Sequence, residues 1–536
     1  MQGYFISKKK ITEIDIRQGD KFLTPALYQV VFLKKDWFEI ANEWYKKRNK
    51  FFSTPNLPNI GKIYFPPDLK PYSYQLRCIK LGYLSKCAGF FLDMGMGKTF
   101  ISLSILKKAV LEDDVKKVLV ICPKSVVLKW RNDILRMQIP LNVYPLIQKI
   151  EQRKLLLSYL RQGIFIINYE ALPYLEKLFK DNPIIFDFLI VDESHRVKNL
   201  KAKTTDVVTT ISAFAKYRFC LSGTPITNTP KDIYTQMFII DPIYTVEELG
   251  GIKDFDEIFL NKDNKYEVAF GKKTEFKKIL KGRSIRYTKD QKLKLPPLTK
   301  TIIPCPLLEV EIYDKVRHET YLEIAEQNIK IGSLWAKLTK LQQITSGFLY
   351  GENRKIIKLN SGKLECLFDF LQDVKEQVVI FAVFQETIKQ ISQKLKCPAI
   401  TGKINSKKRQ IILDKFHKGE FKHLVIQIRA GGTGIELQNA SIACFMELTW
   451  TPADIQQAID RLRRIGQKKP VNVYFFVTEN TIDEYMLKKN EYKESIIKEI
   501  IDHLKEGIED DRQLDEVSKN LSGRMDSKDV CLPTQK

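Results

Sequence analysis

The segment FFLDMGMGKTFISL, residues 90–103, has the residue types of a phosphate-binding loop between a strand and a helix. Glycines at 95 and 97 would let backbone N–H groups approach a phosphate, and a helix beginning near Lys98 would add positive potential. Lys98 could contact the β- and γ-phosphates of a nucleotide, and Thr99 could bind Mg²⁺. The residues expected at the nucleotide are Asp93, Met94, Gly95, Met96, Gly97, Lys98 and Thr99.

The spacing of this loop departs from the strict G-x-x-x-x-G-K-[ST] pattern, because Leu92 stands where the first glycine would be. A tight turn with a chance GKT is therefore the alternative. Asp93 and Gly95 still provide a short, small-residue loop in a strand–loop–helix context, so we keep the phosphate interpretation.

Two adjacent carboxylates end the apolar run FDFLIVDESH, residues 186–195. Ligands bind at the carboxyl ends of strands in open α/β sheets. Asp192 could hold Mg²⁺ through water, and Glu193 could orient or deprotonate an attacking water. A solvated turn is the alternative for an isolated Asp-Glu pair. Its place between the glycine loop and LSGTP at 221–225 favours a catalytic role, and His195 could couple this site to the other side of a cleft.

A third group of polar residues lies in TPADIQQAIDRLRRIGQ, residues 451–467. Thr451 as N-cap, Pro452 at the first position and Gly466 as a stop predict a helix over about 452–465. Their spacing puts Gln457, Arg461 and Arg464 on one face of that helix. Two arginines there could clamp a γ-phosphate, since guanidinium bonds phosphate bidentately. A basic face that binds nucleic acid or solvent is the alternative.

A glycine-rich turn follows a strand at QIRAGGTGIELQNA, residues 427–440. Gly431, Gly432 and Gly434 would permit close backbone approach to a nucleotide or to a nucleic-acid phosphate.

These loops need two sheets to position them. Strand-length apolar runs occur at 88–93, 117–122, 164–168, 188–192 and 217–222, and a second set occurs at 377–383, 397–401, 423–428, 442–448 and 471–477. Continuous apolar strands alternating with amphipathic helices predict parallel sheets covered on both faces. The fold class is therefore α/β, with two sheets in tandem and a helical insertion or linker between them.

The predicted organisation has five parts. A small basic module precedes the first lobe, a helical insertion and Pro-marked linker separates the lobes, and a flexible polar tail ends the chain. In the module, Trp37, Trp44 and Tyr45 could form its core or stack on bases. The five ranges are 1–66, 67–245, 246–360, 361–500 and 501–536.

Composition points to a globular protein that binds polyanions. The 536 residues include 88 Lys plus Arg against 64 Asp plus Glu, a formal net charge of +24. Nucleic acid is the leading partner, and a lysine-rich composition that only aids solubility is the alternative. Nine scattered cysteines without a C-x-x-C pair argue against zinc and disulfides. No apolar run is long enough for a membrane span, so we expect a soluble intracellular protein, in the cytoplasm or a nucleus.

With these motifs in order, residues 67–490 resemble the helicase superfamily two ATPases, and among them the Swi/Snf-type DNA translocases. The matching segments are PYSYQLRCIK, DMGMGKT, VICPKSVVLKW, INYEAL, DESH with RVKN, LSGTPITN, RAGGTGIELQNA and QAIDRLRRIGQ. Asp460 before Arg461, with the ending Ile465-Gly466-Gln467, is the most specific feature. IRYTKDQKLKLPPL and SGKLECLFDFL resemble the family's connecting segments.

The resemblance implies two tandem RecA-like P-loop domains and an ATPase that uses ATP and Mg²⁺ to move on double-stranded DNA. It implies adenine recognition by Gln75, closure of Arg461 and Arg464 onto the triphosphate, and DNA contacts at Lys124, Ser125, Arg429, Gly431 and Trp450. Replication, repair or recombination is the expected setting. A strand-separating DNA or RNA helicase and a non-hydrolysing scaffold are the alternatives.

Overall fold

The structure is a computed structural model that describes residues 2–7, 10–15, 51–54, 56–66, 68–181, 184–227, 229–261, 268–269, 272–318, 321–324, 327–330, 334–351, 355–428 and 435–502. Most of the predicted N-terminal module, including Trp37, Trp44 and Tyr45, and nearly all of the predicted tail lie outside these residues.

The first lobe is built on a seven-stranded sheet in which every pair of neighbouring strands is parallel. Its spatial order is β5 (Val143–Pro145), β6 (Gly163–Asn168), β4 (Lys117–Cys122), β7 (Phe188–Asp192), β8 (Tyr217–Leu221), β3 (Cys87–Leu92) and β9 (Ser284–Tyr287). The carboxyl ends of these strands face one edge of the sheet, where the predicted loops follow β3, β7 and β8.

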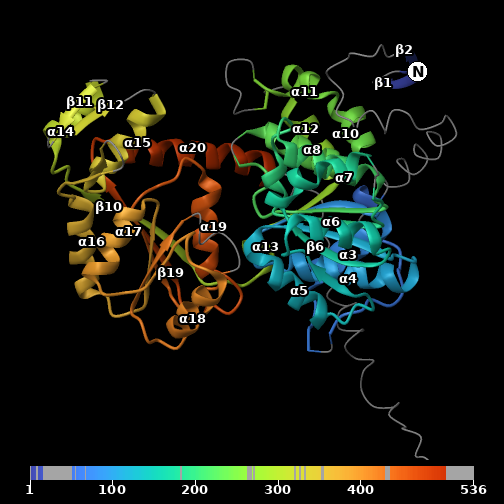
Figure 1. Ribbon diagram of the computed structural model, residues 1–536, viewed down its shortest axis with the longest axis horizontal. Coiled ribbons are helices and arrows are strands. Elements are labelled where there is room, and N and C mark those ends of the chain that lie inside the picture. Colours follow the sequence, from blue (N-terminus) through green and yellow to red (C-terminus); the bar gives the residue numbers. More distant parts are fainter. Residues whose placement is uncertain are drawn as a thin grey trace, which may run out of the picture.

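Helices cover both faces of this sheet (Figure 1). They include α3 (Ser73–Ser85), α4 (Lys98–Glu112), α5 (Val127–Arg136), α6 (Ile150–Tyr159), α7 (Glu176–Asp181), α8 (Lys203–Phe214), α9 (Tyr234–Ile240), α10 (Pro242–Leu249), α11 (Ile252–Phe259) and α12 (Lys273–Lys281).

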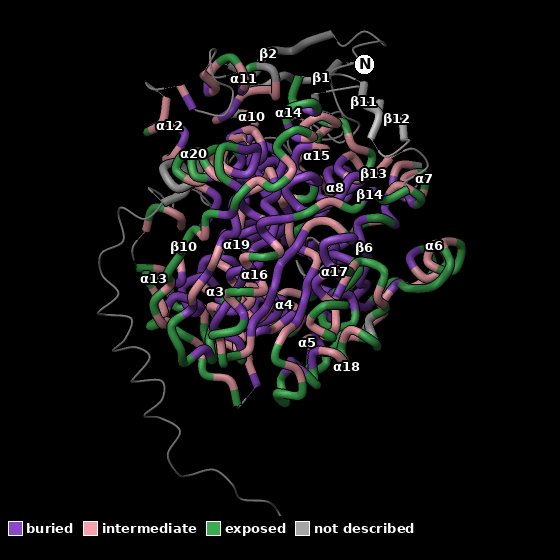
Figure 2. Tube along the Cα trace, turned by 90° about the vertical axis from the view of Figure 1, so that its left-hand side faces the viewer, coloured by how far each residue is buried: buried purple, intermediate pink, exposed green. Residues whose placement is uncertain are grey.

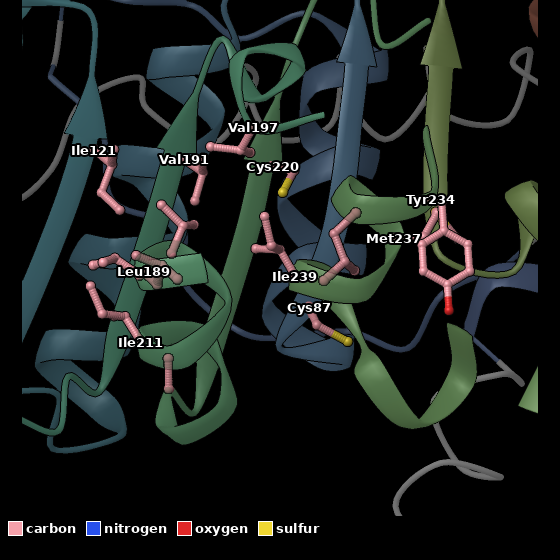
Figure 3. Close-up of a cluster of buried hydrophobic side chains, with 14 of the residues drawn as sticks. Cys87, Ile121, Leu189, Val191, Val197, Ile211, Cys220, Tyr234, Met237 and Ile239 are labelled. Atoms are coloured by element: carbon pink, nitrogen blue, oxygen red, sulfur yellow. The ribbon is translucent and has the colours of Figure 1, made fainter. Parts of the chain in front are cut away.

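Two apolar clusters fill the space between this sheet and its helices. On one face Ile121, Leu189 and Cys220 pack against Met237 and Ile239 of α9 (Figure 3). Alternate residues of the same strands enter the cluster on the opposite face. Strands buried on both faces explain why the sequence shows continuous apolar runs.

The second lobe contains a six-stranded parallel sheet in the order β10 (Leu298–Cys305), β19 (Val471–Thr478), β18 (Ile442–Phe445), β15 (Val378–Ala382), β17 (His423–Gln427) and β16 (Ala399–Ile400). Its faces are also both buried, so the core of each lobe lies around its central strands (Figure 2). The surrounding helices are α14 (Val310–His318), α15 (Leu334–Thr345), α16 (Gly362–Asp373), α17 (Gln385–Lys394), α18 (Ser406–His417), α19 (Pro452–Leu462) and α20 (Ile482–Asp502).

The predicted α/β fold with two tandem parallel sheets is confirmed. The segment 246–360, expected as an insertion and linker, contributes elements to both lobes: β9 completes the first sheet and β10 pairs with β19 in the second. Between them the short helix α13 (Lys289–Lys292) lies beside α19 where the two lobes meet (Figure 1). Helix α20 extends from the second lobe to α12 of the first.

Candidate functional site

The glycine loop has the backbone geometry of a phosphate cradle. Gly95 and Gly97 have φ of 80° and 81°, in the left-handed region that glycine adopts readily, and α4 begins at Lys98 as predicted. The Lys98 ammonium group donates hydrogen bonds to the carbonyls of Leu92 and Asp93 at 2.7 and 3.1 Å. Burial lowers the pKa of Lys98, against the opposing effect of nearby carboxylates. The ammonium is therefore held at the loop by carbonyl groups that a phosphate could replace.

Gln75 supports this loop from α3. Its side-chain amide donates to the carbonyl of Met96 at 3.1 Å, and its carbonyl accepts from the backbone of Tyr72 at 3.0 Å. A Cβ atom at Gly97 would lie 2.4 Å from the Gln75 amide nitrogen, so only glycine fits beside it. Met96 is fully buried behind the loop. Among the predicted nucleotide residues, Asp93 is held from the neighbouring strand β9, where Arg286 pairs with its carboxylate at 2.7 Å.

Asp192 ends β7, and Trp130 orients its carboxylate. The indole nitrogen of Trp130 donates to Oδ2 of Asp192 at 2.9 Å, and the Tyr169 hydroxyl donates to the Asp192 carbonyl. Burial, together with the neighbouring Glu193, raises the pKa of Asp192 to about 6. A half-buried carboxylate with one oxygen fixed by an indole is suited to an ion or a water on the cavity side.

Glu193 and His195 connect the carboxylate pair to the LSGTP segment. Glu193 has φ of 53°, and its buried Oε2 accepts no hydrogen bond among the described residues. Nδ1 of His195 lies 3.5 Å from this oxygen and 3.1 Å from the Ser222 hydroxyl. An unsatisfied buried oxygen beside the phosphate loop is what a water-orienting base requires.

The arginine helix is shorter than predicted. Helix α19 begins after Thr451 with Pro452 at its first position, as expected, but it ends at Leu462 and not near 465. Arg463 leaves helical geometry with φ of −89° and ψ of 83°, because its guanidinium donates to Asp290 at 2.6 Å and to the Pro296 carbonyl at 3.0 Å. Arg464 therefore lies beyond the helix, and the prediction that it shares a helix face with Arg461 is wrong.

Both arginines nevertheless reach the phosphate loop. Arg461 and Arg464 line the same cavity as Lys98, and the Cβ atom of Arg464 lies 3.6 Å from where a Cβ on Gly95 would be. Burial lowers the pKa of Arg461. Gln457 is buried in α19 and is not among the residues that line the cavity.

The cavity between the lobes has a volume of about 510 Å³. The first lobe contributes the loop, the carboxylates and α5, and the second contributes the last turn of α19 and the residues that follow it. Its lining comprises Leu69, Lys70, Tyr72, Gln75, Met94, Gly95, Gly97, Lys98, Thr99, Phe100, Leu103, Val126, Lys129, Trp130, Asp133, Arg136, Met137, Asp192, Glu193, Arg461, Arg464 and Ile465. A helix N-terminus, a lysine and two arginines facing a carboxylate pair fit a triphosphate with Mg²⁺.

The predicted nucleic-acid residues are placed only in part. Lys124 and Ser125 are exposed in the short helix η1 (Lys124–Val126), which directly precedes α5. Trp450 packs edge-on against Trp335 with ring centroids 5.7 Å apart. Arg429, Gly431, Gly432 and Gly434 lie outside the described residues.

Comparison with protein families agrees with this arrangement. Residues 28–347 match the SNF2-related domain, and residues 362–466 match the helicase conserved C-terminal domain. The first match covers more than half of the chain. The chain belongs to the SNF2 family.

Several curated relatives share its sequence. An uncharacterised ATP-dependent helicase of Mycoplasma genitalium is 27% identical over 428 residues, covering 76% of this chain and 40% of that protein. The DNA repair protein rhp54 of Schizosaccharomyces pombe is 25% identical over 515 residues, covering 83% of this chain and 59% of that protein. The SNF2-family chain thus spans about half the length of these relatives. A Sulfolobus solfataricus SWI2/SNF2 ATPase core in complex with dsDNA is 22% identical, with a TM-score of 0.40 over 86% of this chain and 99% of that one.

Sequence reasoning missed four residues of the SNF2-family site. Trp130 fixes Asp192, Arg286 fixes Asp93, Glu436 pairs with Arg464 at 3.1 Å, and Lys289 joins the lobes. The first two lie in segments that already resembled the family, which was the available signal. The other two act through contacts between segments far apart in the sequence.

Among the described residues, no helix has the length and apolar character needed to cross a membrane.

Proposed function

We propose that this SNF2-family chain hydrolyses ATP in the cavity between its lobes and uses the cycle to move on double-stranded DNA. One observation carries the proposal: Lys98 and Thr99, Asp192 and Glu193, and Arg461 and Arg464 line a single cavity although they come from three distant segments. Neither lobe alone supplies the full set, so the site is sensitive to how the lobes are arranged.

Each group has a chemical task in hydrolysis. Backbone N–H groups of the glycine loop and Lys98 would hold the β- and γ-phosphates, with Gln75 at the base. Thr99 and Asp192 would hold Mg²⁺, which when bound neutralises charge on the phosphate oxygens. Glu193 would accept a proton from the water that attacks the γ-phosphorus while the bond to the β-phosphate oxygen breaks. Arg461 and Arg464 would stabilise the charge on the transferred group.

The duplex DNA substrate rests on charge and on the relatives. A formal net charge of +24 favours a polyanion. Named relatives include the DNA repair and recombination protein RDH54 of Saccharomyces cerevisiae and the repair protein rhp54. Lys124 and Ser125 before α5, together with Arg429, Gly431 and Trp450, would contact the nucleic acid. Motion of one lobe against the other during hydrolysis would advance the protein along a strand.

ATP turnover measured with duplex DNA, single-stranded DNA and RNA tests this function. Lys98→Ala should lower kcat by about 100-fold, since it removes a charge held at the transferring phosphate. Lys107→Ala, on the same helix but outside the cavity lining, is the matched control and should keep its turnover. Unchanged turnover in Lys98→Ala contradicts the assignment. Stimulation by RNA or single strands in place of duplex contradicts the proposed substrate, and displacement of a triplex-forming strand tests movement on intact duplex.

A further inference from the structure

The short helix α13 contains a buried lysine that contacts both halves of the nucleotide site. Lys289 has a side chain only 3% exposed. Its backbone N–H donates to Oδ2 of Asp93 in the phosphate loop at 3.0 Å. Its ammonium group pairs with Asp460 of α19 at 3.1 Å and donates to the Arg463 carbonyl at 2.8 Å. One residue of the linker thus bonds to the phosphate loop of one lobe and to the arginine segment of the other.

The two ends of this linkage adjoin the groups that face the cavity. On the first lobe, the Asp93 carboxylate is also held by Arg286, and its carbonyl accepts from Lys98. On the second lobe, Asp460 directly precedes Arg461, and Arg463 directly precedes Arg464. A shift of Asp93 when Lys98 exchanges its carbonyl partners for phosphate would therefore pass through Lys289 to Asp460 and Arg463, which directly precede the two arginines.

The chemistry of the contacts suits a positional role. Asp460 is 10% exposed and also accepts from the Gln456 amide at 3.0 Å, so its carboxylate is fixed in direction. Buried charges cost solvation free energy, and in some proteins a buried charged pair specifies one arrangement of the elements that it joins. Arg463, whose guanidinium bonds to Asp290 of the same helix α13, adds a second bond between the linker and this segment.

We propose that Lys289 is a positioning residue that couples nucleotide at the phosphate loop to the placement of Arg461 and Arg464. This inference rests on the proposed ATPase function. It assigns a mechanical role to the linker, since Lys289 is not among the residues that line the cavity. The coupling acts on the transition-state contacts of the arginines and much less on ground-state binding of ATP by the first lobe.

Steady-state kinetics test the coupling. Lys289→Met and Asp460→Asn should each lower kcat by about tenfold or more, while the KM for ATP changes less than about threefold. Combining them should cost little more than either alone, because both remove the same ion pair. Lys289→Arg should recover much of kcat, because it keeps a charged donor facing Asp460.

Lys363→Met is the matched control for folding. Lys363 pairs with Asp483 at 2.9 Å with side chains 1% and 4% exposed, and this pair lies wholly within the second lobe. At a temperature where all variants are folded, Lys363→Met should keep its kcat. If it loses as much kcat as Lys289→Met, or if Lys289→Met keeps wild-type kcat, the coupling is wrong.

Hydrogen exchange gives a readout that needs no turnover. Adding a non-hydrolysable ATP analogue to the wild type should protect amides of the phosphate loop and of residues 452–465. In Lys289→Met the loop should still be protected, and the protection of 452–465 should be lost. Retained protection overturns the coupling. A wild type without turnover contradicts the proposed ATPase function, and the exchange comparison still decides the coupling in that case.

Discussion

At the scale of single residues, Glu436 faces the arginine that is proposed to meet the triphosphate. Its carboxylate lies 3.1 Å from Arg464 of the same lobe and 3.4 Å from Lys129 of the first lobe. Although burial raises the pKa of Glu436, these two cations hold it below its ordinary value, so the group is ionised. A phosphate approaching Arg464 therefore competes with a carboxylate.

Neutralising this carboxylate should strengthen nucleotide binding. Glu436→Gln keeps the side-chain shape and removes the charge, so we expect the Kd of a fluorescent ATP analogue to fall about threefold, in the range of a partly exposed ion pair. Glu420→Gln removes the partner of Lys415 on the same lobe outside the cavity, and it should leave the Kd unchanged. Weaker binding in Glu436→Gln would show that Glu436 serves to hold Arg464 in place.

His195 gives a pH dependence of stability. Burial, with the neighbouring cations Arg196 and Lys198, lowers the pKa of His195 to about 4. An unfolded chain takes up this proton near pH 6.5, so the folded state loses stability as the pH falls from about 6.5 toward 4. The wild type should lose ~2 kcal/mol more unfolding free energy between pH 7 and pH 5 than His195→Gln.

Urea titrations at the two pH values measure this difference. His318→Gln, at an exposed position on the other lobe, is the control and should follow the wild type. If the wild type and His195→Gln lose equal amounts of unfolding free energy between pH 7 and pH 5, the folded protein does not hold the imidazole in its neutral form.

At the scale of elements, one buried ion pair joins the N-cap of α10 to the residue that precedes β9 in the first lobe. Arg283 pairs with Asp241 at 2.8 Å, with side chains 0% and 3% exposed, and its guanidinium lies 4.1 Å from the ring centroid of Tyr244. Arg283→Met would leave a buried carboxylate without this cation. We expect the unfolding free energy to fall by ~3–5 kcal/mol. Lys154→Met, which removes a surface pair with Glu151, should change it by no more than ~0.5 kcal/mol. Similar thermal shifts in both variants would contradict the buried pair's role.

The strands show what could be predicted from the sequence. The central strands β4 and β7 have the predicted bounds, because burial on both faces leaves an uninterrupted apolar run. Within the two large parallel sheets, three strands were not predicted, and all three, β5, β9 and β10, lie at sheet edges. β10 is mostly exposed and contains Pro304, which an edge strand tolerates. Edge strands carry a weaker apolar signal, so their patterns resemble loops.

The site was predictable where its chemistry is local in the sequence. Residue type and spacing alone predict the glycine loop, the strand-end carboxylates and the two arginines as parts of one site. The C-terminal end of α19 was not predictable, because Arg463 leaves the helix to bond residues 290 and 296 of the linker. The contacts of Lys289 with Asp460 and of Glu436 with Lys129 form only when the lobes meet, and no local sequence pattern predicts such a contact.

At the scale of the whole molecule, charge and aromatic contacts should contribute to DNA binding in different ways. Each lysine at a phosphate releases a counterion, so binding weakens with salt at a slope that counts such contacts. An aromatic ring contributes without this dependence. Exposed Lys124 is proposed to make the first kind of contact, and Trp450, which packs against Trp335 and Tyr485, is proposed to make the second.

Duplex binding measured by fluorescence anisotropy over a salt series separates the two. Lys124→Ala should reduce the slope of log Kd against log salt concentration by about one. Trp450→Ala should weaken binding about tenfold at every salt concentration, since an aromatic contact is worth on the order of 1–3 kcal/mol per base. Lys418→Ala, at the exposed end of α18, should keep both affinity and slope. If Lys124→Ala and Lys418→Ala give equal slopes, η1 is not at the DNA backbone, and if Trp450→Ala binds normally, its ring serves only to pack α15 against α20.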